Sequence, residues 1–98
     1  MTQHYIAGEL SVRLAELQAV ATTRQSAEDL LQLRRRVESC PCASLSCVVR
    51  QALTLTDRLC WESLTCGDAR AFDCQASISA ELREFGICAG LIEEGGFF

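Results

Sequence analysis

The sequence has little of what enzyme active sites usually contain. Its only histidine is His4, and a residue so near a terminus is a poor base for activating a serine or cysteine. There is no phosphate-binding loop, dinucleotide fingerprint, HExxH motif or nucleophile elbow. We therefore expect a protein that is not an enzyme and has no catalytic residue.

Lysine and asparagine are both absent, and all nine basic residues are arginine. We interpret these absences as codon bias in a GC-rich, bacterial genome. The formal charge of −4 disfavours nucleic acid as a partner, because binding to phosphate needs clustered positive charge. The one cluster, Arg34–Arg36, lies between Asp29 and Glu38 and is typical of a solvated helix face. A nucleic-acid-binding regulator that uses this cluster is the least favoured reading.

Long hydrophobic runs are absent as well. The longest uncharged run, Ser39–Val49, is far shorter than the roughly 20 residues of a membrane span. Glu9, Arg13 and Glu16 interrupt the first apolar residues, so we do not expect a signal peptide. These features predict a cytoplasmic protein with no membrane partner and with mostly reduced cysteines.

Apolar residues, in contrast, are abundant at 49%, and they recur with the period of an α-helix. We predict an all-α fold, a small antiparallel bundle of about four helices, with one domain over residues 1–94 and a short tail over 95–98. One long bent helix in place of the first two is the alternative. The predicted helices are Gln3–Ala21, Ser26–Glu38, a third from between Pro41 and Ser46 to about Cys66, and a fourth that Asp68 caps and that reaches Ile92.

Local signals set the predicted ends and faces of these helices. Ser26 is a favourable N-cap for the second helix, and Gly67 suits the position just after the third. The first helix has a narrow apolar stripe, typical of a seam between two helices, whereas the third has a broad face that suits several neighbours. The residues predicted to be buried are Leu10, Leu14, Leu17, Leu33, Val48, Leu59, Ile78 and Leu82.

Seven cysteines are present, and four of them could in principle share a metal. Cys40, Cys42 and Cys47 form a C-x-C-x4-C cluster, and an antiparallel fourth helix would return Cys88 to it. Cys66 lies roughly 30 Å from Cys47 along the third helix, so it is excluded. The alternative function is therefore a zinc, iron–sulfur or thiol redox sensor at these four residues. The spacing differs from the C-x2-C pairs of zinc ribbons, and we prefer to treat the four as thiols without a cofactor. We also expect Cys60 and Cys74 to be inert core residues.

Trp61 is the one aromatic residue out of place. It lies about 160° from the centre of the third helix's apolar face, among Arg50, Asp57 and Arg58. Tryptophan and arginine are enriched at interface hot spots. We therefore predict an interaction surface formed by Trp61, Arg58, Arg50 and Phe72, which would serve a homodimer or an accessory subunit bound to another protein.

Overall fold

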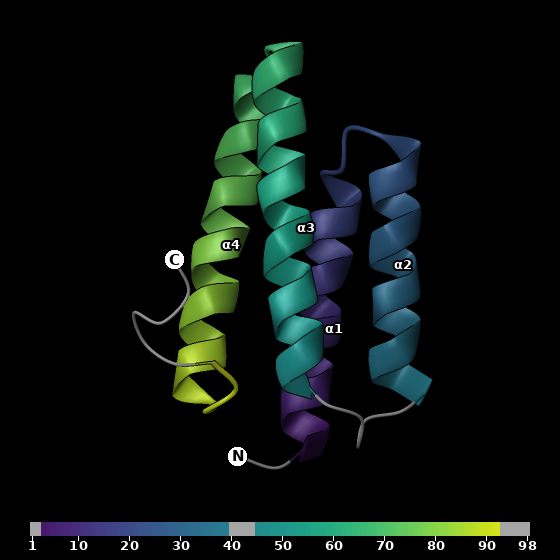
Figure 1. Cartoon of the computed structure of the whole chain (residues 1–98), viewed down its shortest axis with the longest axis vertical. Coiled ribbons are helices and arrows are strands. Elements are labelled where there is room, and N and C mark those ends of the chain that lie inside the picture. The colour runs from purple at the N-terminus through teal and green to yellow at the C-terminus, as the bar shows by residue number, and fades with distance from the viewer. Residues whose placement is uncertain (1–2, 40–44, 93–98) are drawn as a thin grey trace.

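A computed structural model describes residues 3–39 and 45–92 of the chain (Figure 1). Helices make up 88% of these residues, which include no strand. The four helices are α1 (Gln3–Ala19), α2 (Arg24–Ser39), α3 (Leu45–Cys66) and α4 (Ala69–Cys88). The predicted all-α bundle of four helices is therefore confirmed.

The helices run alternately up and down, so that α1 and α2 form one antiparallel hairpin and α3 and α4 form another (Figure 1). α1 and α3 occupy opposite corners of the bundle, with α1 behind α3 in Figure 1. The α3–α4 hairpin is the longer one and extends beyond the turn between α1 and α2. This projecting end exposes every residue from 64 to 70.

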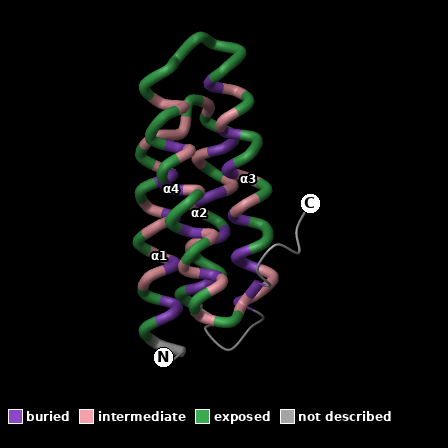
Figure 2. Tube along the Cα trace, turned by 90° about the vertical axis from the view of Figure 1, so that its left-hand side faces the viewer, coloured by how far each residue is buried: buried purple, intermediate pink, exposed green. Residues whose placement is uncertain are grey.

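The core runs along the centre of the bundle, where the buried positions of all four helices meet (Figure 2). The eight residues predicted to be buried are all at most 9% exposed. Leu10, Leu14, Leu17, Leu59 and Leu82 have no exposed surface at all. The prediction of the core from helical periodicity is therefore confirmed.

The narrow stripe of α1 led to a wrong expectation about its neighbours. α1 packs against α2, α3 and α4, not against one helix. A stripe of leucines can contact several helices because it points at the bundle axis, where all of them converge. The broad face of α3 also contacts all three other helices, as predicted.

The first two helices are separate, and the break between them differs in detail from the prediction. α1 ends at Ala19 instead of Ala21, with a tight bond from the Val20 N–H to the Leu17 carbonyl (3.1 Å). The cap of α2 is Thr23, whose Oγ1 accepts a hydrogen bond from the Ser26 N–H (3.2 Å). Ser26 itself lies inside the helix and is fully buried. Its hydroxyl donates to Glu62 on α3 (2.9 Å), so this serine joins two helices.

Glycines with a positive φ end the third and fourth helices. Gly67 (φ 77°) follows α3 as predicted, and Gly90 (φ 74°) closes α4. The Leu91 N–H donates to the Gly86 carbonyl (2.8 Å) and the Gly90 N–H to that of Ile87 (3.0 Å), which is the Schellman pattern. α4 therefore ends at Cys88 instead of Ile92. Ile92 is nevertheless buried, because the reversed chain brings it back onto Gly86.

Two helical glycines offer a matched test of this packing. A Cβ added at Gly8 would meet nothing within 4 Å, whereas one at Gly86 would lie 3.1 Å from Ile92 and from Val49. Gly8→Ala is expected to raise the free energy of unfolding by about 0.5–1 kcal/mol, from helix propensity alone. Gly86→Ala should gain less or lose stability, because the new methyl group must displace its neighbours. Urea unfolding of both variants measures the difference, and an equal gain at both sites would contradict the close packing at Gly86.

Candidate functional site

The outer face of α3 carries the most exposed large apolar side chain among the described residues. Trp61 is 68% exposed, and Leu64, one helical turn further along, is 55% exposed. Both lie in the last two turns of α3. Leu64 belongs to the projecting end, whereas Trp61 lies at the level of the turn between α1 and α2, because Thr23 and Ser26 donate hydrogen bonds to its neighbour Glu62. More than half of each side chain is exposed, so burying the pair against another molecule would be favourable.

Phe72 extends the same surface across the hairpin tip. A small hollow of about 150 Å³ between α3 and α4 has Leu64 and Phe72 in its lining, together with Gly67 and Ala69. Phe72 is half-buried. The tip therefore combines an exposed tryptophan with a shallow apolar hollow beside it, which is the shape that accepts a side chain from a partner. We name Trp61, Leu64 and Phe72 the tip surface.

The two arginines of the predicted surface lie in different surroundings. Arg50 is exposed three turns below Trp61 on α3. Arg58 instead reaches across to α2, where it donates to Asp29 (2.7 Å) and to the Ser26 hydroxyl (3.1 Å). Arg58 thus links α2 to α3, a role that the sequence did not indicate.

The link to Arg58 changes the pKa of the Asp29 carboxylate. Hydrogen bonds from Arg58 and then Gln25 hold the pKa of Asp29 below its usual value. Because its pKa is lowered, the ionised Asp29 carboxylate stabilises the fold at pH values above the ordinary pKa of a carboxyl group. This contribution is lost as the pH falls through the lowered pKa. The Asp29 side chain is only partly buried, so the effect is modest.

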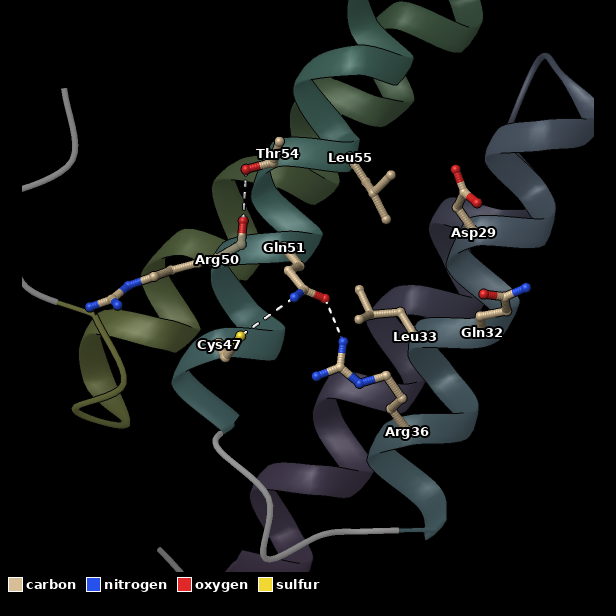
Figure 3. A pocket seen from close by; sticks show the side chains of 9 residues that line it. All are labelled: Asp29, Gln32, Leu33, Arg36, Cys47, Arg50, Gln51, Thr54 and Leu55. Carbon is tan, nitrogen blue, oxygen red and sulfur yellow. Dashed lines mark hydrogen bonds between the residues drawn. The ribbon is translucent and has the colours of Figure 1, made fainter.

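A groove lies between α2 and α3 just below this link (Figure 3). It has a volume of about 450 Å³, and its apolar part consists of Leu33 and Leu55. Across it, the Arg36 guanidinium donates to the Gln51 amide oxygen (2.7 Å), and the Gln51 amide nitrogen donates to the Cys47 sulfur (3.4 Å). The Arg36–Gln51 bond bridges the groove at one end, whereas the Gln51–Cys47 bond stays within α3, and we assign the groove no ligand.

The four-cysteine alternative is only partly within the described residues. Cys40 and Cys42 lie outside them. Cys47 is half-buried in the groove, and Cys88 is exposed at the end of α4. Among residues 3–39 and 45–92, no three histidine, cysteine, aspartate or glutamate side chains are placed to hold a metal. The four-thiolate site remains an untested prediction.

The expectation for the other cysteines was wrong at Cys74. Cys60 is half-buried, but Cys74 is exposed. It lines a hollow of about 540 Å³ together with Cys66, Ala19 at the end of α1, and the turn residues 20–22. Cys74 lies in the second turn of α4, and α1, which ends at Ala19, does not cover it.

These thiols should differ in reactivity. Burial raises the pKa of Cys60, and the charge of Asp57 raises it further. Because the thiolate is the reactive form, Cys60 is expected to be alkylated by iodoacetamide at pH 8 several times more slowly than Cys66 and Cys74. Peptide mapping by mass spectrometry at successive times measures the order, and denaturant should remove the differences. A folded chain in which Cys60 reacts first would contradict its placement.

The arginine cluster does not form a single basic surface. Arg34 turns toward α1 and donates to Gln18 (2.9 Å), whereas Arg36 turns the opposite way and donates to Gln51 on α3 (2.7 Å). Successive residues on a helix point in directions about 100° apart. Adjacent arginines in the sequence therefore serve different neighbours.

No protein family, curated protein or solved structure matches this chain. Within the described parts of the chain, no helix combines the length and the apolar character needed to cross a membrane. The assignment of the tip surface as a functional site therefore rests on its geometry alone.

Proposed function

We propose that this chain is a small, non-enzymatic, cytoplasmic protein of bacterial origin that acts through protein–protein interaction. It works as a homodimer or as an accessory subunit, and it needs no cofactor. The tip surface is the contact, with Trp61 as its anchor. Its partner is a protein, either a second copy or a different chain.

One observation carries this proposal: Trp61 is 68% exposed in the last two turns of α3, on the outside of a well-packed bundle. The bundle already buries leucines on all four helices, so Trp61 is not needed for the core. A tryptophan provides a large apolar area with an N–H donor at its edge, and such residues dominate interface energetics. Leu64 and the hollow beside Phe72 supply the apolar surroundings that such an anchor requires.

Intrinsic fluorescence tests this proposal directly, because Trp61 is the only tryptophan. In dilute solution its emission should resemble that of a fully hydrated indole. When the tip surface is covered, by a second copy at high concentration or by an added protein partner, the emission should shift to shorter wavelength. An emission already typical of a buried indole in the dilute monomer would contradict the proposal, because it would show that the chain itself covers Trp61.

A further inference from the structure

The outer face of α1 is a second apolar surface, and it lies on the side of the molecule away from the tip surface. Tyr5 is 54% and Val12 is 53% exposed. Gly8 and Ala19 are also exposed and Ala15 is half-buried. These five residues follow one another at spacings of three and four, so they form one stripe along the whole helix. The stripe contains no charged residue, and it is directly opposite the leucines that α1 buries.

Charged side chains border this stripe on both sides, and bonds to the neighbouring helices fix which side each occupies. On the side of α4, Arg13 pairs with Glu16 (2.9 Å) and with Glu81 of α4 (3.3 Å). On the side of α2, Arg34 donates to Gln18 (2.9 Å), and Glu38 accepts from Ser11 (3.2 Å).

The two borders carry opposite charges at matching heights. Arg34 lies at the height of Gln18, and Glu16 on the other border is only about 3 Å lower along the helix axis. Glu38 lies at the height of Ser11, and Arg13 on the other border is about 3 Å higher. At both heights, a positive side chain on one border therefore lies across the stripe from a negative side chain on the other border.

We propose that a second copy of this chain docks on the outer face of α1, with the two α1 helices parallel. A two-fold axis parallel to α1 brings the α2 border of one copy against the α4 border of the other. Arg34 then meets Glu16 of the second copy, and Glu38 meets its Arg13. A copy turned end for end would instead place the α4 border against the same border of its partner. Glu9, Glu16 and Glu81 outnumber Arg13 there, so two borders of net negative charge would repel.

The size of this contact sets its strength. Gly8 has open space above its Cα, so the two helix backbones can approach closely there. One helix pair nevertheless buries less area than most stable dimers, and interfaces of this size belong to weak, reversible complexes. The dimer should therefore have a micromolar dissociation constant.

This inference goes beyond the proposed function, because it assigns the contact between copies to α1. α1 and α3 occupy opposite corners of the bundle (Figures 1 and 2). A dimer formed through α1 therefore leaves both tip surfaces uncovered on its outer sides. Each remains free for a different protein.

Sedimentation equilibrium of wild type, Val12→Glu, Val12→Arg and Trp61→Ala tests the contact. Wild type should form dimers, and either charge at position 12 should raise the dissociation constant at least about tenfold. Position 12 is exposed, so both variants should keep the wild-type circular dichroism spectrum. Trp61→Ala should change the constant less than about twofold. Wild type that stays monomeric at high micromolar concentration, or a Val12→Glu dimer as tight as wild type, would overturn the inference.

Charge reversal tests the parallel arrangement. Glu16→Arg and Arg34→Glu should each weaken the dimer about fivefold or more, because each reversal affects two symmetric pairs. The double variant should recover most of the wild-type affinity, since both pairs are restored with their signs exchanged. A double variant that is weaker than both single ones would exclude the parallel pairing of these residues. Because none of these changes touches the tip surface, failure here leaves the Trp61 fluorescence test unaffected.

Discussion

Leu59→Ala is expected to lower the free energy of unfolding by about 2–5 kcal/mol. Leu59 has no exposed surface, and it sits on α3, which contacts all three other helices. Removing the three carbons beyond its β-carbon loses their burial and leaves a cavity that the surrounding helices fill only in part. Ile78→Ala on α4 should have a cost in the same range, because Ile78 belongs to the same core. Urea or thermal unfolding monitored by circular dichroism measures both.

Leu64→Ala is the matched control, because it makes the same substitution in the same helix at a side chain that is 55% exposed. Its cost should stay near half a kcal/mol, so that the difference between the two leucines isolates burial from helix propensity. Losses below about half a kcal/mol at both Leu59 and Ile78 would place these residues on the surface. The packing of α3 and α4 would then be wrong.

Helical periodicity was enough to predict the fold, because each helix points one apolar face at a common axis. The predicted core leucines of α1, α3 and α4 are all buried. The residue type at a helix end was a weaker guide to where the helix begins. Ser26 and Thr23 are both good caps. Thr23 takes this role, and the Ser26 hydroxyl instead donates to Glu62, 36 residues away. No local pattern contains that information.

The end of α4 illustrates a second limit. The apolar stripe continues to Ile92, and Ile92 is indeed buried, yet it is buried after a chain reversal at Gly90. Periodicity cannot distinguish these cases, because both bring an apolar side chain back to the same core. The glycine was the available signal, since a glycine just after a helix favours the left-handed conformation.

The candidate site was predictable in part. Trp61 stood out because one large aromatic side chain occupied a polar helix face. Leu64 did not, since a leucine near the edge of a broad apolar face resembles a core residue. The role of Arg58 depended on Asp29 of another helix. The outer stripe of α1 was overlooked because the leucine stripe on the opposite face dominates the pattern, and small residues such as Gly8 and Ala15 add little apolar signal.

Trp61→Ala is expected to weaken the complex made at the tip surface by about 2 kcal/mol or more, because a desolvated tryptophan is a typical hot spot. The stability of the monomer should change less than it does in Leu59→Ala, since a side chain that is 68% exposed has few contacts to lose. Arg50→Ala should weaken the same complex less, because an exposed arginine at the rim stays in water.

The measurement is best made in a chain that also carries Val12→Glu, which removes the α1 contact between copies. If that chain still associates at high micromolar concentration, adding Trp61→Ala should abolish the association, and the tip surface then joins copies as well. If it is monomeric and its tryptophan emission is that of a hydrated indole, the tip surface is reserved for a different protein. A wild-type dimer that Trp61→Ala disrupts and Val12→Glu does not would reverse the assignment of the two surfaces. If copies associate and neither substitution weakens their association, the contact between copies uses neither the tip surface nor the outer face of α1. Each substitution removes the central apolar group of its own surface.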